Sequence, residues 1–113
     1  MSERDEQIKL VRWLKAHSAT SRYTIALLNE GKRSPQLGAI YKKMGLRPGA
    51  SDIFLALPKG KYHGFWIELK FGTNKATPAQ LQFLNDMRSV GYKGEVIWGY
   101  EEAVRQIEEY LSY

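Results

Sequence analysis

The chain has 113 residues, of which 43% are hydrophobic and 26% charged, a composition that suits one folded domain and excludes a disordered tail. It contains no cysteine, which excludes disulfides, thiolate metal ligands and a cysteine nucleophile. The formal net charge of +5 favours an anionic partner, and nucleic acid is the commonest one. The sequence holds no apolar run long enough to span a membrane and no signal peptide, so we expect a cytoplasmic protein.

Residues 2–17 are expected to form a helix, because Ser2 can cap it and acidic residues fill its first turn. At 100° per residue, three apolar side chains define its inward face: Leu10, Val11 and Leu14. Extended toward the start of the helix, this face passes through Gln7 and Glu3, and Glu6 lies at its edge.

The rest of the chain follows a regular alternation of elements. We expect strands at 21–29, 52–58, 64–71 and 94–100. We expect helices between or after them at 35–45, 77–91 and 101–113. The two central strands are joined by a short basic connection and should form an antiparallel hairpin. The apolar face of the helix at 77–91 is expected to consist of Leu81, Leu84, Met87 and Val90. The order α-β-α-β-β-α-β-α predicts a single α/β domain.

The strand at 64–71 carries charged residues where a core strand should be apolar. Because strand side chains alternate between faces, Glu68 and Lys70 share one face with Trp66. Asp52 begins the partner strand of the hairpin, so its side chain can approach Glu68 and Lys70. One interpretation is an ordinary ion pair on a wetted face. The other is a divalent-cation site, because carboxylate and carbonyl oxygens are the ligands that magnesium prefers, whereas unpaired buried charges are costly.

The spacing of these residues resembles a known signature. "GASD", fifteen residues and then "ELK" are similar to the Asp…Glu-x-Lys motif of PD-(D/E)XK nucleases. More narrowly, the chain resembles the VRR-NUC family, the virus-type replication-repair nuclease domain, through "SERDEQIKLVRWL", "NEGKRS", "MGLRPGASDIFL", "FWIELK" and "TPAQLQFL". These segments run in order along nearly the whole chain. Ser51 stands where many relatives have proline, which affects only the local turn.

The resemblance implies a fold and a metal site. The expected fold is a minimal restriction-endonuclease-like α/β core, a mixed sheet of about four strands flanked by helices, formed by residues 1–113 as one nuclease domain. Asp52, Glu68 and the main-chain carbonyl of Leu69 would bind Mg²⁺, for which Mn²⁺ can substitute, and Lys70 would orient or help deprotonate the attacking water. Whether one or two metal ions bind stays open.

Two further site residues each leave an alternative. The family's acid on the first helix matches Glu3, with Glu6 as the rival, although acids are common at any helix start. The family's glutamine on the helix after the active strand matches Gln80, which we expect to serve catalysis. Thr77 and Gln80 also have the spacing of a capping box, in which the glutamine would only bond back to the cap.

Basic residues cluster in several loops and are expected to contact DNA phosphates through shape and charge, although a solvated surface is the commoner fate of such clusters. The residues selected are Lys32, Arg33, Lys42, Lys43, Arg47 and Lys75.

The resemblance also implies an activity. VRR-NUC proteins of phage and bacteria that consist of this domain resemble Holliday-junction resolvases, so we expect a structure-selective DNA endonuclease of repair and recombination, in a phage or bacterial intracellular setting. It would act as a homodimer, with a contact near Tyr110 and Tyr113. The alternatives are a flap or general branched-DNA nuclease, a DNA-binding module without catalysis, and an acid-binding protein unrelated to DNA.

Overall fold

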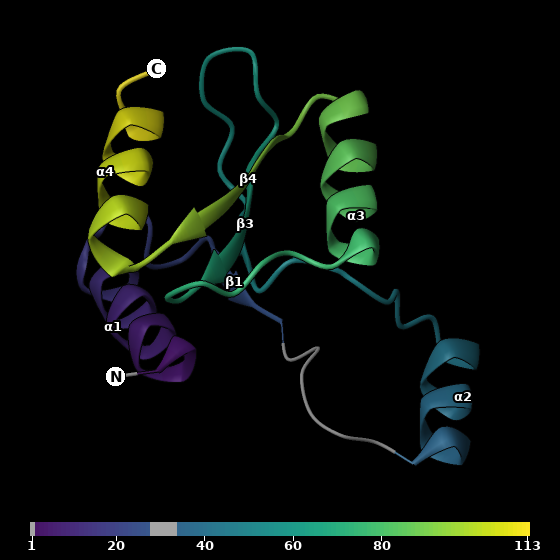
Figure 1. The fold of residues 1–113 in the computed structure, drawn as a ribbon. Coiled ribbons are helices and arrows are strands. Elements are labelled where there is room, and N and C mark those ends of the chain that lie inside the picture. The colour runs from purple at the N-terminus through teal and green to yellow at the C-terminus, as the bar shows by residue number, and fades with distance from the viewer. Residues whose placement is uncertain (1, 28–33) are drawn as a thin grey trace.

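The computed structural model describes residues 2–27 and 34–113. In this part of the chain the elements follow the predicted order: α1 (Glu3–Ala16), β1 (Thr24–Ala26), α2 (Pro35–Lys43), β2 (Ile53–Leu55), β3 (Phe65–Lys70), α3 (Pro78–Ser89), β4 (Lys93–Trp98) and α4 (Tyr100–Leu111). Figure 1 shows these elements along the chain.

The strands form one mixed sheet in the order β1-β2-β3-β4. The predicted hairpin is confirmed, because β2 pairs with β3 in antiparallel register, with Ile53 opposite Ile67. Strand β1 is antiparallel to β2, whereas β3 and β4 are parallel. A parallel pair needs a crossover connection, and α3 supplies it.

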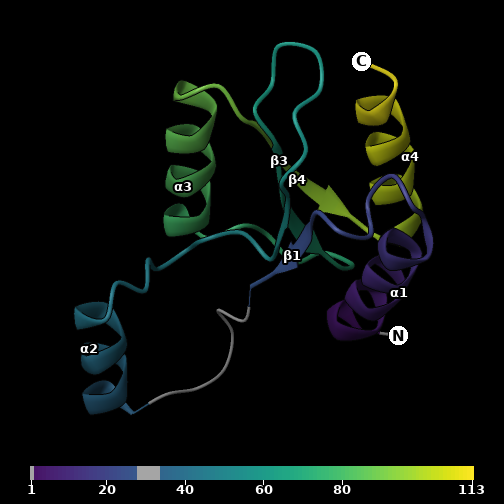
Figure 2. The same ribbon diagram turned by 180° about the vertical axis from the view of Figure 1, so that it is seen from behind.

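Helices cover both faces of the sheet. Helices α1 and α4 lie side by side on one face, and α3 lies on the other (Figures 1 and 2). The predicted alternation along β3 is confirmed, since Phe65, Ile67 and Leu69 pack into the core under α1 and α4. Trp66 faces the other way and packs with the smaller core cluster that contains Phe83 of α3. Glu68 and Lys70 therefore face the α3 side of the sheet, as Trp66 does.

The helix starts follow the sequence closely. Ser2 caps α1, with its hydroxyl accepting a hydrogen bond from the Asp5 N–H at 3.2 Å. Thr77 caps α3. Gly91 follows the end of α3 with φ at +99°, a conformation that glycine adopts without the steric cost of a side chain.

The strands are shorter than predicted. Strand β2 ends at Leu55, before Pro58, whose nitrogen cannot donate to a ladder, and the chain turns through reciprocal backbone bonds between Lys59 and Tyr62. Strand β4 ends at Trp98 because Gly99, with φ at +87°, turns the chain directly into α4.

The predicted apolar face of α3 is wrong for Leu81 and Val90, whose exposed fractions are 46% and 58%. The prediction is confirmed for Leu84, which is buried, and for Met87, which packs against the same cluster, and Phe83 completes the buried face. The ring of Phe83 meets the Trp66 ring edge-on at 4.9 Å, and burying this large aromatic pair stabilises the core more than burying a leucine would.

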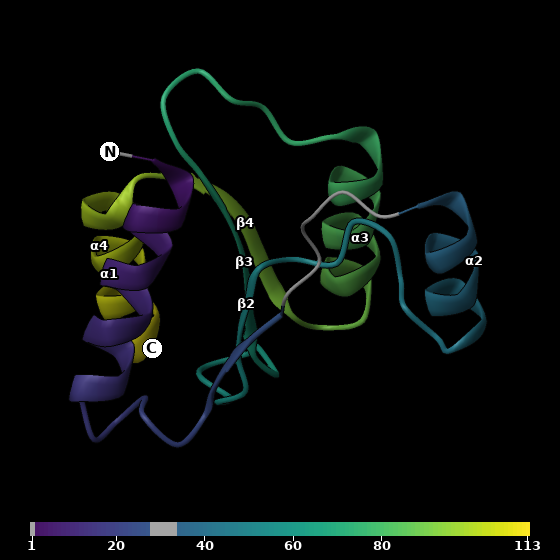
Figure 3. The same cartoon turned by 90° about the horizontal axis from the view of Figure 1, so that it is seen from below.

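Helix α2 stands apart from the sheet, beyond α3 (Figure 3). It contributes no buried residue to the core. Leu37 and Ile40 of this helix, and Met44 directly after it, are exposed. Within the described residues, no helix is both long and apolar enough to cross a membrane.

Candidate active site

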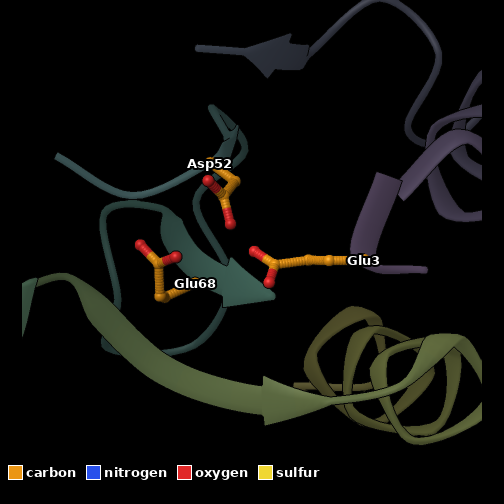
Figure 4. Close-up of side chains that lie close together, drawn as sticks. All are labelled: Glu3, Asp52 and Glu68. Atoms are coloured by element: carbon orange, nitrogen blue, oxygen red, sulfur yellow. The ribbon is translucent and has the colours of Figure 1, made fainter. Parts of the chain in front are cut away.

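Three carboxylates from distant parts of the sequence meet at one edge of the sheet. Glu3 begins α1, Asp52 directly precedes β2, and Glu68 lies in β3. Each offers an oxygen atom within 4.8 Å of the others, and Figure 4 shows the three side chains directed toward one another. The hairpin register brings Asp52 to Glu68, because Ile53 lies opposite Ile67. In the described part of the chain, this is the one such group of acids or histidines.

Asp52 is held by the backbone of the neighbouring strand. Its exposed fraction is 3%, and its Oδ2 accepts a hydrogen bond from the Leu69 N–H at 3.0 Å. The N–H and C=O of one residue in an extended strand point to the same side, so the Leu69 carbonyl also faces the Asp52 side of β3. The next carbonyl, that of Lys70, points to the opposite side and accepts from the Gly99 N–H at 3.0 Å.

Glu68 is fully buried, and neither of its oxygens has a hydrogen-bond partner among the described residues. The Nζ of Lys70 lies 3.4 Å from Glu68 Oε2. Burial and the nearby Asp52 carboxylate raise the pKa of Glu68 to about 9, although Lys70 opposes the shift. Buried acceptors without partners are costly, and an all-oxygen donor set suits a hard divalent cation. The residues present therefore fit such an ion.

Glu6, the rival acid on α1, has a different role. Its Oε1 lies 3.5 Å from the Tyr100 N–H, which donates to it, at the start of α4. The residue that precedes α4, Gly99, has no side chain to cap the helix, so the Glu6 carboxylate balances the positive helix end instead. Its Oε2 is 3.9 Å from Lys9 Nζ. Of the two acids, Glu3 joins the carboxylate group and Glu6 does not.

Gln80 forms the capping box that the sequence allowed. Its Oε1 accepts a hydrogen bond from the Thr77 N–H at 2.8 Å, and its own N–H donates to Thr77 Oγ1 at 3.2 Å. This structural role accounts for the side-chain oxygen of Gln80. Its catalytic role stays a prediction.

Three of the basic residues selected from the sequence lie on or beside helices away from the carboxylates. Lys42 and Lys43 lie in the exposed last turn of α2, beyond α3 (Figure 3). Arg47 is engaged with α3, since its guanidinium pairs with Asp86 and lies 5.1 Å from the centre of the Phe83 ring. The hydrogen bond from Arg47 lowers the pKa of Asp86.

Lys75 is exposed in the loop between β3 and α3, downstream of the strand that carries Glu68. Lys32 and Arg33 lie outside the described residues.

The predicted dimer contact near the end of α4 is wrong for Tyr110. Its side chain is completely buried, and its hydroxyl donates a hydrogen bond to the Leu57 carbonyl at 2.7 Å. Tyr113 is 47% exposed.

Two arginines that were not among the predicted site residues also lie beside the acids. A groove of about 500 Å³ runs beside Glu3 and Asp52, and Arg4 and Arg12 of α1 also line it. A signal existed in the sequence, because residues eight apart lie on one face of a helix.

Comparisons with known proteins agree with this architecture. No family model matches the chain, and no curated protein matches it. A solved structure described as a "VRR_NUC domain protein" has a TM-score of 0.84 and 27% sequence identity to the chain, and the match covers 99% of this chain and 89% of that chain.

The fold class predicted from the sequence is confirmed: the chain is a minimal restriction-endonuclease-like α/β core with a mixed sheet flanked by helices. The resemblance to the VRR-NUC family is confirmed as well, and it supports a nuclease-type function.

Proposed function

We propose that residues 1–113 act as one metal-dependent endonuclease domain that hydrolyses phosphodiester bonds in DNA. The observation that carries the proposal is the convergence of Glu3, Asp52 and Glu68, with Lys70 beside them, in a chain similar to a VRR-NUC domain protein. Such a group of acids has no evident structural use, because mutual repulsion and burial both oppose it.

The metal ligands in this proposal are Asp52, Glu68, Glu3 and the carbonyl of Leu69. Mg²⁺ is the expected ion because all these donors are oxygens, and Mn²⁺ can replace it. A bound divalent cation would lower the pKa of a coordinated water and neutralise charge that develops on the phosphate.

Lys70 is proposed to position the nucleophile. An ammonium group has three donors and no acceptor, so it can hold a water or hydroxide oxygen in a fixed direction. Its stem is buried in β3, and its Nζ is 3.4 Å from Glu68, which restricts it to the neighbourhood of the acids. Gln80 is retained as a candidate catalytic residue, and Lys42, Lys43, Arg47 and Lys75 as candidate DNA contacts, together with Lys32 and Arg33.

The proposed substrate is branched DNA, with a four-way junction first, cut by a homodimer. A four-way junction has two-fold symmetry, and two cuts resolve it, so a C₂ dimer would supply two equivalent sites. The exposed apolar residues of α2 provide surface that a second copy would cover. A flap or general branched-DNA nuclease is the alternative, and a non-catalytic DNA-binding module is a weaker one because the ligand set is complete.

Cleavage of labelled four-way, flap and linear DNA with Mg²⁺ or Mn²⁺ tests the proposal. The matched variant is Asp52→Asn, which keeps an oxygen to accept from the Leu69 N–H and removes the charge. We expect symmetric nicks in the junction with the wild-type chain, none with the variant or with chelator, and a dimer in sedimentation. Equal cleavage by both chains would overturn the metal site, and a strict monomer would overturn the resolvase assignment.

A further inference from the structure

The groove beside the carboxylates has a cationic wall on α1. Arg4 and Arg12 line the same hollow as Glu3 and Asp52, and Ile8 lies between the two arginines on the helix. The positions i, i+4 and i+8 follow one another along a single helix face. The lining of the groove therefore combines two arginines with two acids, Glu3 and Asp52.

These two arginines are available for a ligand. Both are exposed, and neither has an ion pair or hydrogen bond within the described residues. Three other arginines of the described residues are engaged: Arg47 pairs with Asp86, Arg105 pairs with Glu102 and Glu109, and Arg88 donates to the Gly94 carbonyl at 2.8 Å. In the same part of the chain Arg22 is exposed and unpaired, but it does not line the groove. Arg4 and Arg12 are thus set apart by two properties together: neither has a partner among the described residues, and both line the groove beside the acids.

Binding of a polyanion such as DNA next to a group of acids requires positive charge close to the site. The acids of the site repel a polyanion, and the ammonium beside them, that of Lys70, is buried and lies against Glu68. Guanidinium groups bind phosphate through paired N–H donors, which makes arginine well suited to this contact. We propose that Arg4 and Arg12 form a phosphate-binding wall that guides a DNA strand along α1 to the carboxylates. This inference rests on the proposed function.

The spacing indicates that the two arginines contact different phosphates. Eight helical residues rise about 12 Å, whereas successive phosphates of one strand advance about 3.4 Å along a duplex axis. Ile8, 49% exposed, supplies apolar surface between them, against which deoxyribose carbons can pack. The wall therefore recognises the backbone of DNA and not its bases.

Salt dependence of binding tests the wall without requiring catalysis. The metal-free protein is titrated against a labelled linear duplex at several NaCl concentrations, and log K is plotted against log[NaCl]. This slope is negative, and each lost phosphate contact reduces its magnitude by about 0.9. We therefore expect Arg4→Gln and Arg12→Gln each to make the slope less negative by about that amount. The double variant should lose about twice as much, whereas Arg4→Lys with Arg12→Lys should restore most of the slope.

The matched control is Lys61→Gln, which removes one exposed charge from the β2–β3 connection, at the opposite end of the hairpin from Asp52. It should leave the slope unchanged, and circular dichroism should show the same helix content in all variants. Unchanged slopes in the arginine variants, or a loss just as large in the control, would overturn the wall even if the wild-type chain cleaves DNA. Arginine-dependent binding without any cleavage would support the wall and overturn the nuclease proposal instead.

Discussion

The ammonium of Lys70 lies 3.4 Å from Oε2 of Glu68, and the exposed fractions of the two side chains are 8% and 0%. A buried lysine at this place is costly unless its charge is used. We expect Lys70→Met, which keeps most of the volume and removes the charge, to lower the cleavage rate by about 10²–10⁴-fold, the usual contribution of a positioned acid or base. Single-turnover kinetics on the four-way junction measure the effect.

A merely structural role for Lys70 makes a different prediction. In that case Lys70→Met would change the thermal unfolding midpoint and leave the cleavage rate of the folded fraction near that of the wild type. We expect the midpoint to be maintained, because an apolar side chain replaces a buried charge whose partner, Glu68, is itself protonated at neutral pH in the absence of metal.

The stability of the metal-free protein should fall with rising pH. Burial and Asp52 raise the pKa of Glu68 from 4.5 to about 9, so the folded state holds this proton more tightly than the unfolded chain does. The resulting stabilisation is complete below pH 4.5 and is lost as the pH rises to 9, by at most about 1.4 kcal/mol per pH unit. Urea unfolding in chelator between pH 5 and 9 measures this slope.

Glu68→Gln is the control for the pH series, since the amide cannot titrate and should flatten the curve between pH 5 and 9. Added Mg²⁺ should also reduce the slope in the wild-type chain, because a cation stabilises the ionised carboxylate. The same slope in wild type and variant would show that another group controls stability in this range.

Glu3 and Glu6 form a matched pair, three residues apart on α1. Glu3→Gln should weaken Mg²⁺ binding and cleavage by at least about tenfold while leaving the free energy of unfolding nearly unchanged. Glu6→Gln should lower the free energy of unfolding by about 0.5–2 kcal/mol, because α4 loses the carboxylate at its start, and should leave cleavage intact. Calorimetry and the cleavage assay on both variants check this. Lost cleavage in Glu6→Gln together with lost stability in Glu3→Gln would contradict the metal role given to Glu3 and the helix-end role given to Glu6.

Gln80 and Thr77 provide a second matched pair. Each side chain makes one of the two capping-box hydrogen bonds, so Gln80→Ala and Thr77→Ala should each cost about 1 kcal/mol of stability. If Gln80 also serves catalysis, only Gln80→Ala should slow single-turnover cleavage. Equal rates in the two variants would restrict Gln80 to its capping role.

The central part of the site could be predicted from the sequence because its geometry is local. The period of two along β3 fixes the common face of Glu68 and Lys70, and a short hairpin connection fixes which residue lies near them. The position of Asp52 near Glu68 could therefore be predicted by counting residues along the hairpin. The caps of α1 and α3 were equally local, since Ser2 and Thr77 act within three residues.

The remaining features depended on contacts between distant segments. Glu3 and Glu6 both lie toward the inward side of α1, and what separates them is Gly99, almost a hundred residues away, which leaves α4 without a side-chain cap. The face of α3 was set by the meeting of Phe83 with Trp66, which helical periodicity alone does not reveal. The burial of Tyr110 likewise depends on Leu57, in a segment far along the chain.

The separation of α2 from the sheet bears on how this protein can change. Because no side chain of α2 is fully buried, substitutions there should disrupt little packing within one copy of the chain. Substitutions at the sheet edge are more restricted, because Asp52 and Glu68 are buried there and belong to the group of acids. Variation in what the protein recognises can therefore accumulate on one outlying helix while the chemistry stays fixed elsewhere.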